Sequence, residues 1–95
     1  MEINILGLDY EVVLTDQVST SESLNGMIDY QNLRILLDKN LAPDLLKQTF
    51  IHEVMHGILN GLGMDDLRDD EKAVQGIAST LYCTFKDYFT FSLWD

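Results

Sequence analysis

Two histidines four residues apart, His52 and His56, flank a glutamate in the short sequence HEVMH. On an α-helix these two positions lie only about 40° apart, so both imidazoles can reach one ion. Imidazole nitrogen is a good ligand for Zn²⁺, and a catalytic zinc with three protein ligands keeps a fourth position open for water. Glu53 lies about 100° from His52, beside such a water, where it could act as general base. The motif predicts a hydrolytic zinc site that still needs one protein ligand.

The third ligand must come from another part of the chain, which has no third histidine. Leu59 and Leu62 stand where a metzincin would have its glycine and last histidine, so that class is excluded. On a following helix, Glu71 would lie on the centre line of an apolar stripe as its only carboxylate. A carboxylate that faces a core is unfavourable unless it is paired or binds a metal, so Glu71 is the predicted ligand. Asp69 and Asp70 are rivals, and a first-turn glutamate can also turn to solvent or cap the backbone.

Four more polar residues are weaker candidates for the site. Gln75 shares the face of Glu71 and could orient a ligand or contact substrate, or it could be a partly exposed polar residue. Tyr30 and Tyr82 could donate to a developing oxyanion, although a packed core tyrosine is the more typical interpretation of Tyr82. Asp66 could accept a hydrogen bond from a ligand histidine, or it could be a loop or capping residue.

The first half of the chain has the alternating apolar pattern of strands. EINIL and YEVVLT predict one hairpin, with a turn at Gly7, Leu8 and Asp9, and GMIDY and LRILLD predict a second across Gln31 and Asn32. In the second hairpin, Ile35 and Leu37 would face the core. DQVSTSESLN, between the hairpins, is polar and predicts a loop.

The second half of the chain predicts two helices. The first begins at Pro43 and runs to about Asn60, and its apolar residues lie nearly all round it, which is typical of a buried helix. The second begins in the Asp-rich run with Asp66 or Asp69 as its N-cap and continues to about residue 89. The predicted fold is α+β: a small, mostly antiparallel sheet of two N-terminal hairpins, packed by the HEVMH helix and a C-terminal helix.

Composition limits the other functional classes. The 95 residues predict a single domain over residues 1–95, too small for a separate substrate-recognition domain. A net charge of -10 repels nucleic acid and anionic membranes, and no apolar run is long enough to span a bilayer. The N-terminus lacks the basic region of a signal peptide, and a lone cysteine, Cys83, rules out an intrachain disulfide, so a cytoplasmic setting is expected.

Three segments together, GMIDYQNLRILLD, HEVMH and DEKAVQGIA, resemble the small zincin-like metallopeptidases of the ImmA/IrrE type, above all the minimal versions in bacteriophages and integrated elements. The resemblance covers roughly residues 24 to 88. It implies a gluzincin-like fold in a bacterial host cell, with one Zn²⁺ on His52, His56 and Glu71, and Glu53 as catalytic base. It also implies a peptide or protein substrate such as a repressor-like regulator.

Two alternatives to a peptidase remain open from the sequence. The small size is also compatible with a non-catalytic, zinc-stabilised module that binds a host or phage regulatory protein. The high negative charge is compatible with an acidic mimic that binds a basic surface.

Overall fold

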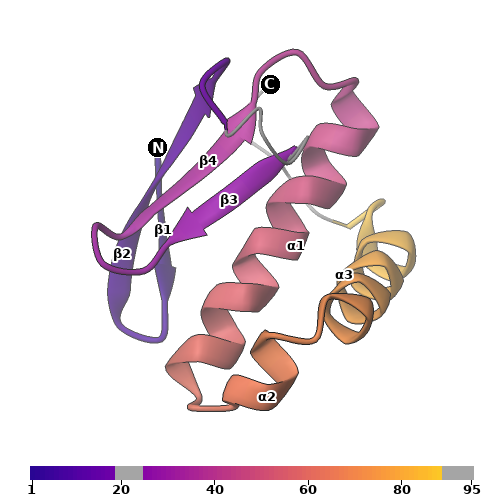
Figure 1. The fold of residues 1–95 in the computed structure, drawn as a ribbon. Helices are drawn as coiled ribbons and strands as arrows, with labels where there is room; N and C mark the ends of the chain where they lie inside the picture. Colours follow the sequence, from indigo (N-terminus) through magenta and orange to yellow (C-terminus); the bar gives the residue numbers. More distant parts are fainter. Residues whose placement is uncertain (19–24, 89–95) are drawn as a thin grey trace.

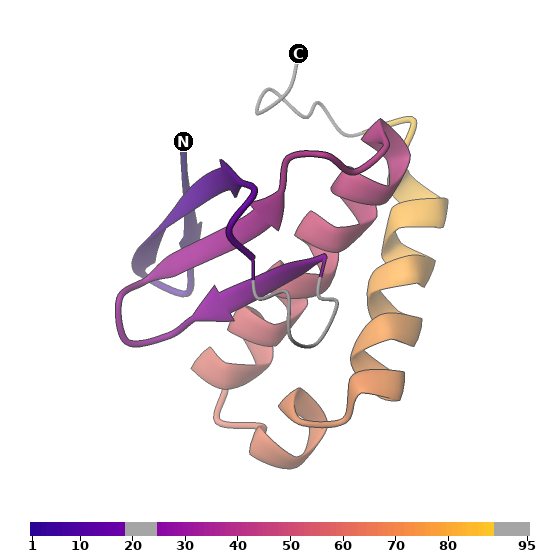
Figure 2. The same ribbon diagram turned by 45° about the horizontal axis from the view of Figure 1, so that its top comes forward.

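The fold is a four-stranded sheet with its helices on one face (Figure 1). A computed structural model of the chain describes residues 1–18 and 25–88. Helix α1 lies between the sheet and α3 in both views (Figures 1 and 2). The elements are β1 Glu2–Ile5, β2 Leu8–Thr15, β3 Gly26–Asp29, β4 Arg34–Asp38, α1 Pro43–Gly61, α2 Asp65–Arg68 and α3 Glu71–Phe85. The predicted α+β class is confirmed.

The sheet joins the two predicted hairpins through their inner strands, in the order β1-β2-β4-β3. Each hairpin is antiparallel, but β2 and β4 pair in parallel, so the sheet is mixed. The turn predicted at Gly7, Leu8 and Asp9 was wrong by about one residue, because Leu8 and Asp9 already belong to β2. The turn is formed by Leu6 and Gly7, whose φ angles of 50° and 92° fit the type I′ turn of a tight hairpin. This arrangement leaves β3 at an edge of the sheet, beside α1.

The core forms on both sides of α1. Ile35 and Leu37 face it from the sheet, as predicted, and both are fully buried. On the other side, Val74 and Ala78 of α3 pack against Met55 and Leu59 of α1. The prediction that α1 is apolar nearly all round and buried between two layers is therefore confirmed. The sheet-side cluster contains Ile5, Tyr10, Val12, Ile35, Leu37, Leu46 and Phe50.

The second helical region differs from the prediction in its start and its end. A separate single turn, α2, precedes α3, and Asp66 lies inside that turn while Asp69 ends it. The N-cap of α3 is Asp70, whose side chain accepts a 3.1 Å hydrogen bond from the backbone N–H of Ala73. Helix α3 ends at Phe85, and residue 89 lies outside the described residues.

None of the helices within the described residues has the combination of length and hydrophobicity that a membrane span requires.

Candidate metal centre

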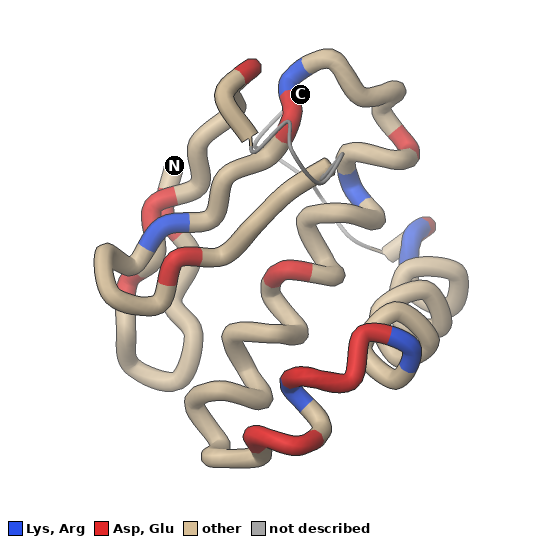
Figure 3. Tube along the Cα trace, viewed as in Figure 1, with Lys and Arg blue, Asp and Glu red and all other residues tan. Residues whose placement is uncertain are grey.

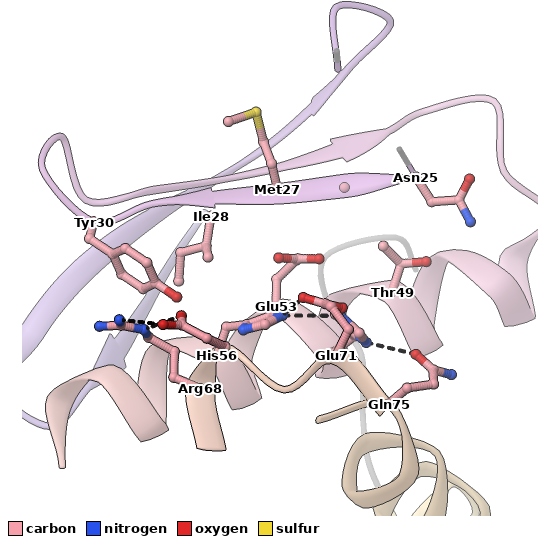
Figure 4. Close-up of a pocket in the computed structure, with 13 residues that line it drawn as sticks. Asn25, Met27, Ile28, Tyr30, Thr49, Glu53, His56, Arg68, Glu71 and Gln75 are labelled. Carbon is pink, nitrogen blue, oxygen red and sulfur yellow. Dashed lines mark hydrogen bonds and ion pairs between the residues drawn. The ribbon is translucent and has the colours of Figure 1, made fainter. Parts of the chain in front are cut away.

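Three potential metal ligands converge where α1 passes the start of α3 (Figure 4). The Nε2 atom of His56 lies 2.7 Å from one carboxylate oxygen of Glu71, and the Nε2 atom of His52 lies 3.0 Å from the other. The two Nε2 atoms are 3.2 Å apart, and the ligand atoms of all three residues lie within 4.8 Å of one another. Two ring nitrogens this close, beside a carboxylate, need a proton or a cation between them. The group could hold one metal ion.

The histidines reach this point because α1 approaches the sheet closely at Gly57. A Cβ atom on Gly57 would stand 2.9 Å from Cδ1 of Ile5 and 3.1 Å from Cδ1 of Ile28, tighter than ordinary packing. A glycine directly after His56 therefore lets the helix lie low against β1 and β3. Gly26 has the same role on β3, since a Cβ there would be 2.8 Å from Cγ2 of Thr49. Neither glycine was among the sequence-based candidates, although Gly57 adjoins the motif.

Glu71 meets the histidines, but not in the buried setting that the helical phase suggested. Its side chain is 68 % exposed, because α3 begins at this residue and the buried part of its stripe starts one turn later, at Val74. The expectation of a carboxylate that faces the core was therefore wrong. What places Glu71 beside the histidines is its position as the first residue of α3, directly after the Asp70 cap. Glu71 forms the rim of the site.

Gln75 fixes the orientation of His52. Its Oε1 atom lies 2.7 Å from Nδ1 of His52, and its Nε2 atom donates to the hydroxyl of Ser79 at 2.8 Å. With the amide held this way, Oε1 accepts, so Nδ1 of His52 carries the proton. In this tautomer the Nε2 atom of His52 has no proton and can bind a cation placed between it, Glu71 and His56, as a metal ligand must.

Glu53 is a buried carboxylate next to the convergence point. It is only 7 % exposed and points from α1 toward β3 (Figure 4), and no described residue forms a hydrogen bond or ion pair with its carboxylate. Burial raises the pKa of Glu53 to about 7; nearby His52 lowers it in part, and the charge of Glu71 raises it further. A carboxylate held in this state is typical of a general base that works near neutral pH.

The raised pKa of Glu53 predicts how stability depends on pH in chelator-treated protein. Between the ordinary pKa of 4.5 and about 7, the folded state holds a proton that the unfolded state releases. The free energy of unfolding should therefore fall as pH rises through this window, by up to about 3 kcal/mol. Urea denaturation of the wild type and of Glu53→Gln across this range measures the effect. The glutamine variant lacks the titrating group, so an equal pH dependence in both proteins would contradict the prediction.

A cleft of about 690 Å³ surrounds these residues. Its walls are α1, β3 and the region where α2 leads into α3. Tyr30 and Arg68 lie at one end of the cleft, and Asn25, Thr49 and Gln75 lie at the other (Figure 4). The cluster of His52, His56 and Glu71 is thus open to a ligand of peptide size rather than sealed in the core.

The end of the cleft near Tyr30 is organised by Arg68. The guanidinium makes two hydrogen bonds to the carboxylate of Asp69, at 2.9 and 3.1 Å, and a third to the side chain of Asn60 at 2.8 Å. It also lies 5.9 Å from the ring centroid of Tyr30. Burial, with the nearby Glu53 and Asp69, raises the pKa of Tyr30 to about 12 despite the charge of Arg68, so its hydroxyl remains a donor. Arg68 carried no sequence signal for this role.

Two of the weaker candidates do not belong to the cleft. Asp66 lies outside it, in the single turn α2, and cannot orient a ligand histidine. Tyr82 is buried in the core and donates a 2.9 Å hydrogen bond to Asp44, which ties α3 to the start of α1. The rival ligands are also engaged elsewhere, since Asp69 is held by Arg68 and Asp70 caps α3. Of the weaker candidates, Gln75 and Tyr30 line the cleft.

Comparison of the chain with protein-family models, with curated proteins and with solved structures found no match. Any function must therefore be argued from the site.

Proposed function

We propose that the protein is a zinc-dependent peptidase of the zincin type. His52, His56 and Glu71 would hold one Zn²⁺, and Glu53 would be the general base. The observation that carries the proposal is the convergence of three ligand groups beside a buried carboxylate, which no described residue binds, in an open cleft. Structural metal sites are closed by four protein ligands, whereas three ligands and an open side are typical of catalytic zinc.

The donor set and its spacing fit zinc. Two imidazole nitrogens and one carboxylate are a common zinc ligand set, as in the His₂Glu sites of metallopeptidases. Ligand atoms at zinc distances from a tetrahedral centre stand roughly 3.3 Å apart. The Nε2 atoms of His52 and His56 are 3.2 Å apart, close to this spacing. Glu71 meets them through different oxygens, one 3.0 Å from His52 and the other 2.7 Å from His56, so either oxygen or both could bind the ion.

The chain's own residues supply the remaining chemistry. Zinc bound at this site would lower the pKa of water and polarise the scissile carbonyl. Glu53 is buried and its pKa is raised to about 7, so it can take the proton of the attacking water and pass it to the leaving amine nitrogen. Tyr30, a neutral donor at the end of the cleft, can hydrogen-bond the oxyanion that develops on the carbonyl oxygen. Gln75 keeps His52 in the required tautomer.

An extended peptide is the substrate form that the cleft favours. Strand β3 lies at the sheet edge and lines the cleft. The backbone N–H of Asp38 donates to the carbonyl of Asn25, so Asn25 and Asp38 form a hydrogen-bonded pair between β3 and β4. Such pairs alternate along antiparallel strands, and the N–H and C=O groups of Gly26 and Ile28 therefore point away from β4. A substrate strand could pair with these groups along the cleft. The resemblance to ImmA/IrrE-type proteins makes a phage or element repressor in the bacterial cytoplasm the first protein to test.

The test combines metal analysis with a cleavage screen. Protein purified without added zinc is expected to contain about one zinc per chain and to cleave members of a fluorogenic peptide library, with both properties lost on chelation. A protein that acquires no metal even when zinc is supplied would rule out the proposal.

A second function, a non-catalytic zinc-stabilised module, is favoured by one observation. The ligands link two helices, with His52 and His56 on α1 and Glu71 on α3, so that an ion there would also hold the fold together. A protein that binds zinc and gains stability from it, but cleaves no peptide or repressor, would support this function instead.

Replacing Gln75 with leucine is expected to weaken zinc binding about 10- to 100-fold, because His52 loses the acceptor that fixes its tautomer and ring orientation. Competition with a chromophoric chelator measures the affinity. Gln31→Leu, at an exposed glutamine in the β3–β4 turn, is the matched control and should bind zinc as the wild type does. Equal affinities for the two variants would show that Gln75 does not support His52.

Replacing Tyr30 with phenylalanine should lower kcat about 100-fold with little change in KM, because the hydroxyl would act on the transition state rather than on bound substrate. No described residue accepts or donates a hydrogen bond to this hydroxyl, so its removal leaves no buried partner behind. Tyr88→Phe, at a tyrosine that is 82 % exposed, is the control. A change confined to KM would assign Tyr30 to substrate binding.

A further inference from the structure

Four large apolar side chains are exposed together at one end of the molecule, where the β1–β2 turn meets the end of α1. Their exposed fractions are 58 % for Leu6, 49 % for Leu8, 54 % for Leu62 and 50 % for Met64. A Cβ on Gly61 would stand 2.8 Å from Cδ1 of Leu6, so the turn and the helix end are in contact, and Figures 1 and 2 show them side by side. We call these four residues the leucine end. Exposed apolar groups that gather at one end of a molecule are candidates for an interaction site.

Leu6 is an unfavourable residue for its position in the isolated protein. Its φ of 50° is in the left-handed region, where a branched apolar residue is strained. The first central position of a type I′ turn is best filled by asparagine, which suits this backbone and is soluble. Leucine does not favour this turn. Its Cδ1 lies against Gly61 of α1, but the side chain is still 58 % exposed and remains available to a partner.

An acidic hollow adjoins the leucine end. Gly63, Met64, Asp65, Asp66 and Leu67 line it, and its volume is about 360 Å³. Asp65 is bound by Arg68, but no described residue forms a hydrogen bond or ion pair with the exposed carboxylate of Asp66. Figure 3 shows the acidic residues of α2 at the end of α1. The leucine end therefore favours an apolar group of a ligand, and the adjoining hollow favours a cation on the same ligand.

We propose that the leucine end and the Asp66 hollow dock a segment of another protein that presents apolar side chains next to lysine or arginine. A second copy of this chain would bring Asp65 and Asp66 against like charges of a protein whose net charge is -10. An anionic membrane is repelled by the same charge. A basic, amphipathic protein segment satisfies both the apolar and the acidic part of the surface. This docking goes beyond the proposed peptidase activity and does not require zinc.

The test uses a fluorescein-labelled synthetic helical peptide with leucine on one face and lysine on the other, and measures binding by anisotropy at physiological salt. Leu62→Gln and Leu6→Asn should each weaken binding about tenfold, and Asp66→Asn about threefold. Leu45→Gln removes a leucine of similar exposure, 42 %, at the other end of α1 and should change nothing. A peptide with glutamate in place of lysine should not bind.

Each other outcome has a defined meaning. Absence of binding to the wild type, or equal binding by all variants, would overturn the proposal, the latter because general charge attraction would suffice. A wild type that sediments as a dimer and becomes monomeric in Leu62→Gln would assign the surface to a second copy. Leu6→Asn should have a melting temperature no lower than that of the wild type. A lower melting temperature would show that Leu6 stabilises the fold, and the peptide binding of Leu62→Gln and Asp66→Asn would then decide whether the surface docks a partner. Chelated protein should bind equally, so failure of docking and failure of the zinc site are distinguishable.

Discussion

Glu53→Gln is expected to reduce peptide hydrolysis about 1000-fold while zinc stays bound. The amide is close to isosteric with the carboxylate but cannot accept a proton, and general bases contribute about 100- to 10,000-fold to such reactions. Glu53 is not within the group of ligand atoms, so metal content should be unchanged. Single-turnover kinetics on a cleaved library peptide, with zinc measured in the same samples, test both halves of the expectation.

The control for this variant is Glu11→Gln, which makes the same chemical change at an exposed position in β2. Full activity in Glu11→Gln and loss in Glu53→Gln would locate the effect in the cleft. Two results would count against the mechanism: undiminished cleavage by Glu53→Gln, or loss of its zinc, since the latter would make Glu53 a ligand rather than a base.

Removal of zinc is expected to lower the free energy of unfolding by about 4 kcal/mol, the linkage expected for free zinc at roughly 1000 times the dissociation constant. For a domain of this size the melting temperature would fall by about 20 °C. The physical reason is that a bound ion would join His52 and His56 on α1 to Glu71 on α3. Without the ion, these polar atoms lie close together and have only protons between them.

Thermal melts with and without chelator measure this effect, and Glu71→Gln separates the ligand from general salt effects. That variant should already melt near the chelated wild type and respond little to added zinc. Glu11→Gln again serves as the matched control and should retain the full zinc-dependent increment. A melting temperature that is the same with zinc and with chelator would rule out both the peptidase and the zinc-stabilised module.

The sequence predicted the parts of the site that depend on local periodicity. The spacing of His52 and His56 within one helix requires only the α-helical repeat, and the two hairpins follow from alternation and turn residues. The angular position of Glu71 on its helix could also be predicted, because the α-helical repeat fixes the direction in which each side chain leaves the axis. Phase does not say how far along the axis the core extends, which is why the exposure of Glu71 was missed.

The remaining features depend on contacts distant in sequence. The parallel pairing of β2 with β4 joins two hairpins whose own patterns would fit several sheet orders. In the Asp-rich run, Asp66, Asp69 and Asp70 all suit a helix N-cap, and only the docking of Arg68 on Asp69 and Asn60 decides among them. Arg68 itself carries no pattern, since its role is defined by partners on α1, α2 and the β3–β4 turn.

The short connection between the two helices has a consequence for how the protein folds. All three proposed ligands come from residues 52 to 71, and only the turn α2 and its flanking residues separate α1 from α3. Closing so short a loop loses little chain entropy, and a helical pair can form in microseconds, whereas the pairing of β2 with β4 must join more distant segments. An ion captured by the helical pair would therefore be able to bind before β2 and β4 have paired. The sheet that lines the cleft would then assemble against a metal centre already in place.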